Sequence, residues 1–299
     1  MPNTSMQEYA FLAVHSPMSK LKQLHLALGH LNYLLIISML CNGLVCGISL
    51  SQRELSITPP QCNACMKGKA TRASFPASKS RQAESVLGLV HSDLWGPSLV
   101  TSIDGMHYML TLTDNKSWWL WVIFLKSKGE ALKVFVDWLV YVEKQTGLKL
   151  HTIHTDNGGE YLSQLWNKFL KECGIRHGLT SPYTPEQNGV SERQNYTIFD
   201  HVHTILIDSG LLLFLLPEAI KYIVYTKNRH VTQSLNNATP FKIHYGKKPD
   251  ISNLHPFGCK AYVYNHSPKQ NKLEPQANEG IFVGYSNTQK AYQIYVSSW

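Results

Sequence analysis

The chain has 299 residues, of which 43% are hydrophobic and 16% are charged, and its formal net charge at pH 7 is +8. This length suggests two or three domains, and the hydrophobic content excludes a disordered chain. The basic surplus favours a polyanionic partner such as nucleic acid or an acidic membrane. The six cysteines are too few and too unevenly spread for a secreted disulfide scaffold, so a reducing compartment is the simpler interpretation.

Residues 1–20 are polar and irregular, with no basic segment followed by an apolar core, so we expect no signal peptide. The uncharged stretch 31–50 is about long enough to span a bilayer. Polar residues and glycines interrupt it. We therefore expect a short buried helix, a turn at Asn42-Gly43 and then a strand. No membrane partner is expected.

From residue 86 onward the pattern of apolar residues predicts a mixed α/β sheet with helices. Strands are expected over 86–93, 107–113, 120–125 and 148–155. Helices are expected over 128–146, 162–173, 190–209 and from Pro217. The segment 181–189 (SPYTPEQNG) has two prolines and an Asn-Gly pair, which predict a loop. From Phe257 the chain alternates short strands and turns, which predicts a small β-rich module.

Three acidic residues carry the clearest chemical signal. Asp93 and Asp156 each end a predicted strand, and Glu192 lies on a helix after 35 intervening residues, 157 to 191. Strand-end aspartates on adjacent strands would share one edge of the sheet, and a glutamate from a helix could close over it. Because clustered carboxylates raise each other's pKa, such a group calls for cations. Taken singly, each acid is better explained as a cap, a turn residue or a surface charge.

Hard divalent cations match that need. Mg²⁺ accepts carboxylate, water and phosphate oxygens as ligands. Two such ions roughly 4 Å apart support in-line phosphoryl transfer. The sequence therefore predicts two Mg²⁺ or Mn²⁺ ions at these three acids.

A second cluster combines two histidines with a CxxC pair: His25, His30, Cys62 and Cys65. This Cys₂His₂ set matches the tetrahedral preference of Zn²⁺ and predicts one structural zinc ion. On one straight helix the histidines would lie about 140° apart, so we expect Gly29 to break the helix and let His30 turn back. Cys41 and Cys46 are also near, either as spectators or as replacement ligands.

These motifs together resemble the integrase segment of copia-type long-terminal-repeat retrotransposon polyproteins over residues 20 to 297. The resemblance rests on HLALGHLNY, CNACMKGKATRASFP, VHSDLWGP, TDNGGEY, SPYTPEQNGVSER, LPEAI and PFGCKAYV. It implies a ribonuclease-H-like mixed sheet as the core and Asp93, Asp156 and Glu192 as catalytic metal ligands. It also implies a zinc-binding GAG-pre-integrase domain.

The implied domains follow one another along the chain. They are an irregular N-terminus at 1–20, the zinc domain at 21–70, a basic linker at 71–85, the catalytic core at 86–250 and a small β-rich module at 251–299.

Several residues are candidates for contacts with DNA. They are Gln187, Asn188 and Arg193 around the predicted loop, and Lys67, Lys69 and Arg72 in the basic stretch 66–85. A plain turn and a solvated connector are the alternatives for these two segments. A third basic stretch, 221–248, has six Lys or Arg and interleaved aromatic residues, which fit phosphate contact and a helix core equally well.

The implied function is DNA integration by a Mg²⁺-dependent polynucleotidyl transferase and endonuclease. The protein would process the 3′ ends of element DNA and transfer them into target DNA. Joining two ends implies a homo-oligomer, acting in the nucleus and otherwise held in a cytoplasmic particle. The alternative is a catalytically inactive or truncated nucleic-acid-binding protein, because Trp118, Tyr196 and His203 stand where the family often has Arg. A related nuclease or transposase is disfavoured by the zinc motif.

Overall fold

A computed structural model of the chain describes residues 11–12, 19–55, 61–68, 82–98, 102, 104–179, 185–264, 276–286 and 291–296. The chain divides into two compact units. The first contains Met1–Ala70, Asp200–Thr226 and Asp250–Trp299, and the second contains Thr71–Phe199 and Lys227–Pro249. Each unit is thus assembled from segments that are distant in the sequence. The boundaries predicted at residues 70, 85 and 250 stay predictions.

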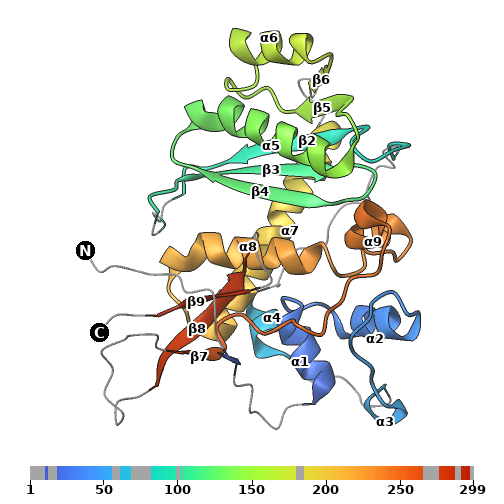
Figure 1. The fold of residues 1–299 in the computed structure, drawn as a ribbon, viewed down its shortest axis with the longest axis vertical. Coiled ribbons are helices and arrows are strands. Elements are labelled where there is room, and N and C mark those ends of the chain that lie inside the picture. The colour runs from blue at the N-terminus through green and yellow to red at the C-terminus, as the bar shows by residue number, and fades with distance from the viewer. Residues whose placement is uncertain are drawn as a thin grey trace. The chain divides into compact units, whose positions relative to one another are not determined.

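The described strands of the second unit form one five-stranded sheet in the order β4-β3-β2-β5-β6 (Figure 1). The strands are β2 (Val90–Trp95), β3 (Tyr108–Asp114), β4 (Leu120–Leu125), β5 (Thr152–Thr155) and β6 (Arg176–Leu179). β2, β3 and β4 are antiparallel neighbours, whereas β2, β5 and β6 run parallel. This arrangement confirms the predicted mixed, ribonuclease-H-like α/β sheet. Strand β6 was not predicted, because RHGL has no alternation of apolar and polar residues.

Helices α5 (Ala131–Thr146) and α6 (Gln164–Glu172) form the core together with this sheet. The 3-10 turn η1 (Lys128–Glu130) precedes α5, and Gly147 ends it in the left-handed conformation at φ +68°. Phe135 of α5 packs against Trp166 of α6 with ring centroids 4.8 Å apart. Both rings are fully buried. The helical spacing seen in the sequence therefore marked the core face correctly.

Helix α7 (Pro185–Ser209) begins five residues earlier than expected. The loop predicted over 181–189 is therefore wrong for 185–189, and 181–184 lie outside the described residues. Proline lacks only an N–H that the first helical turn leaves without an intrahelical partner, so Pro185 suits a helix start. Gly210 follows the helix at φ +65° and its N–H donates to the Leu206 carbonyl, as the sequence predicted.

Two short elements complete the second unit. They are the 3-10 turn η3 (Gln233–Leu235) and helix α9 (Pro240–Tyr245), which follow helix α8 (Leu216–Lys227) in the chain. Thr239 caps α9, since its hydroxyl accepts from the Lys242 N–H at 3.1 Å. The ring of His244 stacks on Trp119 at 4.7 Å.

The first unit contains a second sheet in the order β1-β7-β8-β9, with every neighbouring pair antiparallel. Its strands are β1 (Phe11–Leu12), β7 (Lys260–Tyr264), β8 (Ala277–Tyr285) and β9 (Tyr292–Tyr295). The three C-terminal strands confirm the predicted β-rich module. The pairing of β1 with β7 corrects the expectation of an irregular N-terminus at 11–12, where two residues are too few to show a pattern.

Besides the C-terminal part of α7 and most of α8, the first unit contains short helices. They are α1 (Lys20–Ala27), α2 (Tyr33–Cys41), α3 (Gln52–Leu55), α4 (Asn63–Gly68) and the 3-10 turn η2 (Leu213–Leu215) before α8. Helix α2 and a turn at Asn42-Gly43 confirm part of the prediction for 31–50. The strand expected after that turn is wrong, because only Cys46 forms a bridge, to Asp250. Across the described residues, every helix is too short or too polar to cross a bilayer.

Candidate catalytic and metal centres

Two of the three predicted catalytic carboxylates come from neighbouring parallel strands. Asp93 lies on β2, and Asp156 directly follows β5. The two strands pair in the register Val90 with Ile153 and His91 with His154. Extending that register by two residues places Asp93 beside Asp156, on the same face of the sheet as His91 and His154. The expected convergence of strand-end aspartates is therefore present.

Helix α7 reaches the same edge of the sheet. The side-chain amide of Asn195 donates a hydrogen bond to Oδ2 of Asp93. Asn195 is only 6% exposed. Glu192 lies three residues earlier in α7. Since helix positions three apart share one face, position 192 is one turn from the Asn195 contact.

Tyr161 lies near both aspartates and was not singled out from the sequence. Its hydroxyl and that of Ser92 form a hydrogen bond of 3.0 Å, and its ring is fully buried. Burial, reinforced by the nearby carboxylates of Asp93 and Asp156, raises the pKa of Tyr161 far above its usual value. The phenol therefore stays neutral. The only sequence signal was its place at the end of TDNGGEY.

The turn after Asp156 leaves little room for a side chain at Gly158. The Gly158 N–H donates to Oδ1 of Asp156 at 3.0 Å. A Cβ atom at Gly158 would lie 2.9 Å from the Glu160 carboxyl and 3.0 Å from that Asp156 oxygen. Asp156 thus serves as the turn residue that its context suggested. A carboxylate has about four lone-pair sites, so this role is compatible with cation binding.

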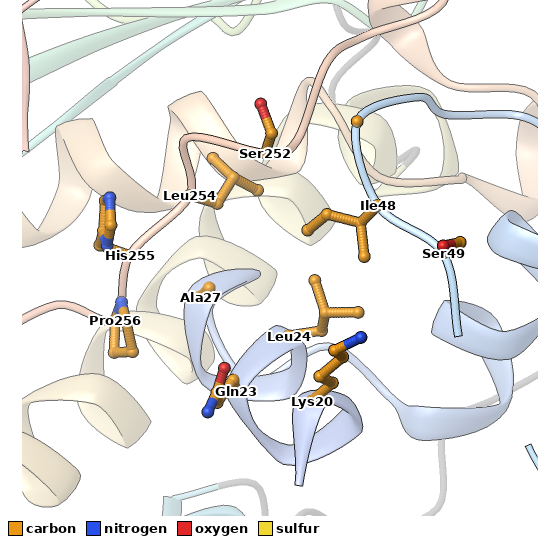
Figure 2. Close-up of a pocket in the computed structure, with 11 residues that line it drawn as sticks. Lys20, Gln23, Leu24, Ala27, Ile48, Ser49, Ser252, Leu254, His255 and Pro256 are labelled. Atoms are coloured by element: carbon orange, nitrogen blue, oxygen red, sulfur yellow. The ribbon is translucent and has the colours of Figure 1, made fainter. Parts of the chain in front are cut away.

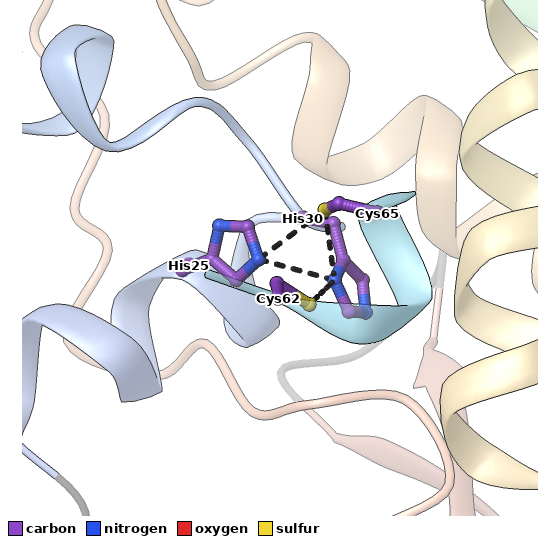
Figure 3. Close-up of side chains that lie close together, drawn as sticks. All are labelled: His25, His30, Cys62 and Cys65. Atoms are coloured by element: carbon purple, nitrogen blue, oxygen red, sulfur yellow. Dashed lines mark hydrogen bonds between the residues drawn. The ribbon is translucent and has the colours of Figure 1, made fainter. Parts of the chain in front are cut away.

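The four predicted zinc ligands converge in the first unit, as Figure 3 shows. Nδ1 of His30 lies 3.2 Å from Nε2 of His25 and 3.4 Å from Sγ of Cys62. Sγ of Cys65 lies 3.5 Å from both of those ring nitrogens. The four candidate ligand atoms all lie within 4.8 Å of one another. The break in helix α1 occurs as expected, with Gly29 at φ +64° and His30 at φ +59°.

These distances suit a tetrahedral zinc ion. Bonds of about 2.0 Å to nitrogen and about 2.3 Å to sulfur separate tetrahedral ligand atoms by about 3.3 to 3.8 Å. Both histidines are 2% exposed, whereas both cysteines are partly exposed, so the histidine side of the cluster is shielded from water. Cys41 and Cys46 are exposed and lie outside the cluster, which fits the spectator alternative. The donor set and its spacing therefore fit Zn²⁺.

The outward-facing nitrogens of the two histidines have acceptors. Nδ1 of His25 donates to the Leu31 carbonyl at 2.8 Å, which leaves Nε2 as the metal-facing atom. Nε2 of His30 faces Oδ2 of Asp208 on helix α7 at 3.6 Å. The contact with His30 lowers the pKa of the Asp208 carboxyl. Asp208 was not identified from the sequence, which has no local signal for a partner so far along the chain.

Tyr33 covers the other side of the cluster. Its ring stacks on His25 at a centroid distance of 4.3 Å and an interplanar angle of 13°. Burial, together with the negative charge of Cys62 and Cys65, raises the pKa of Tyr33 to about 12. The stacked ring therefore fixes the His25 plane and excludes water from one side of the cluster.

The predicted DNA contacts are only partly described. Arg193 on α7 and Lys67 on α4 are exposed. The backbone of Gln187 and Asn188 lies in the first turn of α7. Lys69 and Arg72 lie outside the described residues. These positions leave the DNA-contact prediction open.

The basic and aromatic stretch at 221–248 separates into two kinds of residue. Tyr222 is fully buried, which favours the core interpretation there. Tyr245 is 44% exposed, and Lys242, Lys247 and Lys248 are exposed. The guanidinium of Arg229 lies 5.2 Å from the centroid of the Phe241 ring. The core interpretation thus holds for Tyr222, and phosphate contact by the exposed lysines stays a prediction.

A cavity of about 460 Å³ lies in the first unit, and none of the residues that line it is a predicted site residue (Figure 2). Lys20, Gln23 and Leu24 of the α1 region line one side, and Ser252 and His255 line another. Its lining mixes polar and apolar side chains without a cluster of charges or nucleophiles. We assign it no catalytic role.

Comparison with known families places two domains on the chain. The integrase core domain matches residues 83–185, and the retroviral polymerase SH3-like domain matches residues 259–298. The first match contains Asp93 and Asp156, and Glu192 lies seven residues beyond its end. The group of His25, His30, Cys62 and Cys65, which we call the zinc-type cluster, lies outside both matches.

Solved structures with similar folds include two retroviral proteins. One is a simian T-cell lymphotropic virus intasome in complex with PP2A regulatory subunit B56 gamma, at 20% identity and TM-score 0.47, covering 79% of this chain and 84% of that one. Another is the HTLV-2 integrase catalytic core domain in complex with magnesium, at 21% identity and TM-score 0.42, covering 55% of this chain and 100% of that one.

Curated relatives are polyproteins of plant transposons. The retrovirus-related Pol polyprotein from transposon TNT 1-94 of Nicotiana tabacum is 35% identical over 83% of this chain, and that from transposon RE1 of Arabidopsis thaliana is 30% identical over 97%. The chain spans 18% and 19% of the length of these two polyproteins. The chain therefore contains an integrase core domain and a retroviral polymerase SH3-like domain, and it is similar to segments of retrovirus-related Pol polyproteins from plant transposons.

Proposed function

We propose that this chain is a retrotransposon integrase that trims the 3′ ends of element DNA and joins them to target DNA. The observation that carries this proposal is the placement of Asp93 beside Asp156 on adjacent parallel strands, with helix α7 contacting Asp93 through Asn195. An acidic edge of this kind is unfavourable unless cations bind to it. The integrase core match covers both aspartates.

Asp93, Asp156 and Glu192 would hold two Mg²⁺ or Mn²⁺ ions. With both ions bound, a site of this kind activates the attacking oxygen and stabilises the leaving oxygen of a phosphodiester. Asn195 holds the Asp93 carboxylate in place, and the Gly158 N–H holds that of Asp156. The phenol of Tyr161, hydrogen-bonded to Ser92 next to Asp93 in β2, stays neutral and adds no charge to the site. The protein's own contribution is thus to orient acids before DNA arrives.

His25, His30, Cys62 and Cys65 would hold one structural Zn²⁺. The proposal is supported by the ligand spacing and by the burial of both histidines. Zinc sites of this type stabilise folds that are otherwise too small to be stable alone. We assign this ion no part in the chemistry.

DNA is the proposed partner. Arg193 and Lys67 are exposed and suited to phosphate contact, and Gln187, Asn188, Lys69 and Arg72 are proposed to act with them. A homo-oligomer is proposed because one reaction joins two DNA ends. The nucleus is the proposed site of action, after passage through a cytoplasmic particle.

A nucleic-acid-binding protein without catalysis is the second candidate. It is favoured by Tyr196, which is 59% exposed on α7 where the family often has a basic residue. Loss of this cation removes a phosphate contact that would position bound DNA over the carboxylates. This candidate predicts DNA binding with no joined product.

A strand-transfer assay separates the two candidates. Purified full-length chain is incubated with Mn²⁺ or Mg²⁺, a labelled terminal-repeat duplex and a target plasmid. We expect wild type to give joined product and Asp156→Asn to reduce it by at least about 100-fold. Asp137→Asn, which removes an exposed charge on α5, is the matched control and should retain activity. Wild-type DNA binding without any product would support the binding-only candidate.

A further inference from the structure

The C-terminal half of helix α7 contacts the zinc-type cluster at three places. Nδ1–H of His201 donates to the carbonyl of Gly29 at 2.6 Å. The backbone of Gly68 packs so closely on Thr204 that a Cβ there would lie 2.4 Å from the threonine hydroxyl. Oδ2 of Asp208 lies 3.6 Å from Nε2 of His30. Residues 201, 204 and 208 have helical spacing and share one face of α7.

These contacts involve both the segment that carries His30 and the helix that carries Cys65. Gly29 immediately precedes His30, and Gly68 closes helix α4, which carries Cys65. One helix face therefore holds the histidine loop and the cysteine helix together. The residues involved are far apart in sequence: His201 and Gly29 are separated by 172 positions.

The orientation of His30 gives Asp208 a specific role. Nδ1 of His30 faces the other three candidate ligand atoms. A neutral imidazole that binds metal through Nδ1 carries its proton on Nε2. That Nε2 atom faces the Asp208 carboxylate, which is 41% exposed. A carboxylate behind a metal-binding histidine fixes the ring and raises its basicity.

We propose that Asp208 is a positioning residue of the zinc site, accepting a hydrogen bond from Nε2–H of His30 and so linking metal affinity to helix α7. The inference rests on the zinc site proposed above and names the residue that tunes it. The same helix carries Glu192 in its N-terminal half. Zinc binding therefore anchors one end of the helix that supplies the third carboxylate.

Zinc affinity of the full chain, measured by competition with a chelator, tests the role of Asp208. Removing such an outer carboxylate typically weakens metal binding by about 10- to 100-fold. We expect a loss in that range for Asp208→Ala, a smaller loss for Asp208→Asn, whose amide oxygen can still accept, and recovery in Asp208→Glu. Asp137→Asn, with the same charge change on an exposed helix position, should bind zinc as wild type does.

A second readout separates positioning from general support. In the zinc-loaded chain, the Nε2–H proton of His30 should exchange with water more slowly in wild type than in Asp208→Ala, as measured by imidazole ¹⁵N NMR. If Asp208→Ala does not fold, the same two measurements on Asp208→Asn and Asp208→Glu decide the matter.

The outcomes distinguish this inference from the zinc proposal itself. Wild type that binds no zinc would overturn the zinc site. Wild type that binds one zinc, with Asp208 variants of equal affinity and equal Nε2–H exchange, would overturn only the role of Asp208. The graded loss, with protection of the proton, supports both.

Discussion

The two candidate metal centres are built in opposite ways. In the first unit, four nitrogen and sulfur atoms already lie within 4.8 Å of one another, and the outward nitrogens of both histidines face oxygen acceptors. In the second unit, Asp93 and Asp156 line one edge of a sheet, and the third acid comes from the start of a long helix. A closed, buried cluster suits a structural ion, whereas an open acidic edge suits ions that must share ligands with a substrate.

This contrast has a physical origin in the ligands. Thiolate and imidazole ligands complete a tetrahedron by themselves and leave no open position. Mg²⁺ keeps water and phosphate oxygens in its coordination shell, so protein carboxylates supply only part of it. Complete coordination by protein atoms would block catalysis. Stability is therefore expected to depend on the first centre and activity on the second.

The largest effect on folding is expected from Cys65→Ser. Structural zinc contributes about 10 to 16 kcal/mol in zinc-finger peptides at pH 7, which is comparable to the whole stability of a domain. We expect zinc content to fall from one ion per chain to nearly none, with loss of one cooperative transition in calorimetry. Cys41→Ser, at an exposed cysteine of α2, is the control. Full zinc content in Cys65→Ser would contradict the assignment of Cys65 as a ligand of the structural ion.

A smaller effect is expected on the pH dependence of the free energy of unfolding of the second unit. Burial lowers the pKa of His244 from 6.5 to about 4. The unfolded chain takes up a proton near pH 6.5 and the folded chain only near pH 4, so this contribution is complete above pH 6.5 and is lost as the pH falls toward 4. The slope is less than about 1.4 kcal/mol per pH unit, because the ring is partly exposed.

His244→Phe keeps an aromatic ring against Trp119 and removes the titration. Urea unfolding between pH 7 and 4 should therefore show a flatter loss of stability in this variant, while zinc release is followed separately. His203→Gln, at an exposed position of α7, should leave the slope unchanged. Equal slopes for wild type and His244→Phe would show that the ring titrates alike in both states.

The smallest effect is expected from Tyr161→Phe, which removes the hydroxyl that bonds to Ser92 at 3.0 Å. Leaving one buried hydroxyl without its partner costs about 1 to 3 kcal/mol. Chemical denaturation should report that loss with zinc content unchanged. Tyr196→Phe, at a residue that is 59% exposed, should be neutral. An unchanged free energy of unfolding in Tyr161→Phe would mean that the hydrogen bond to Ser92 contributes no net stability.

Much of the site could be predicted from sequence because its signals are local. The CxxC pair and the two histidines indicated their chemistry through residue type and spacing. The apolar period of α5 marked the buried face that the structure has. Asp93 and Asp156 were visible because each ends an apolar segment that predicts a strand. In each case one short segment contains the whole signal.

The remaining parts depend on contacts between distant segments. Asn195 and Asp93 are 102 positions apart, and Tyr161 and Ser92 are 69 apart. Asp208 meets His30 only because the C-terminal half of helix α7 packs against the zinc-type cluster. No local pattern encodes such pairs. The start of α7 was misplaced for another reason, since Pro185 and Gly189 indicate a turn and are also tolerated in a first helical turn.

The central claim is that three carboxylates, the third of them on helix α7, perform DNA strand transfer. The most direct measurement compares Glu192→Gln with wild type in the metal-dependent joining of a terminal-repeat duplex to a target plasmid. Our account predicts loss of product in Glu192→Gln, with zinc content, melting temperature and DNA binding unchanged. Joined product at the wild-type level in Glu192→Gln would contradict it.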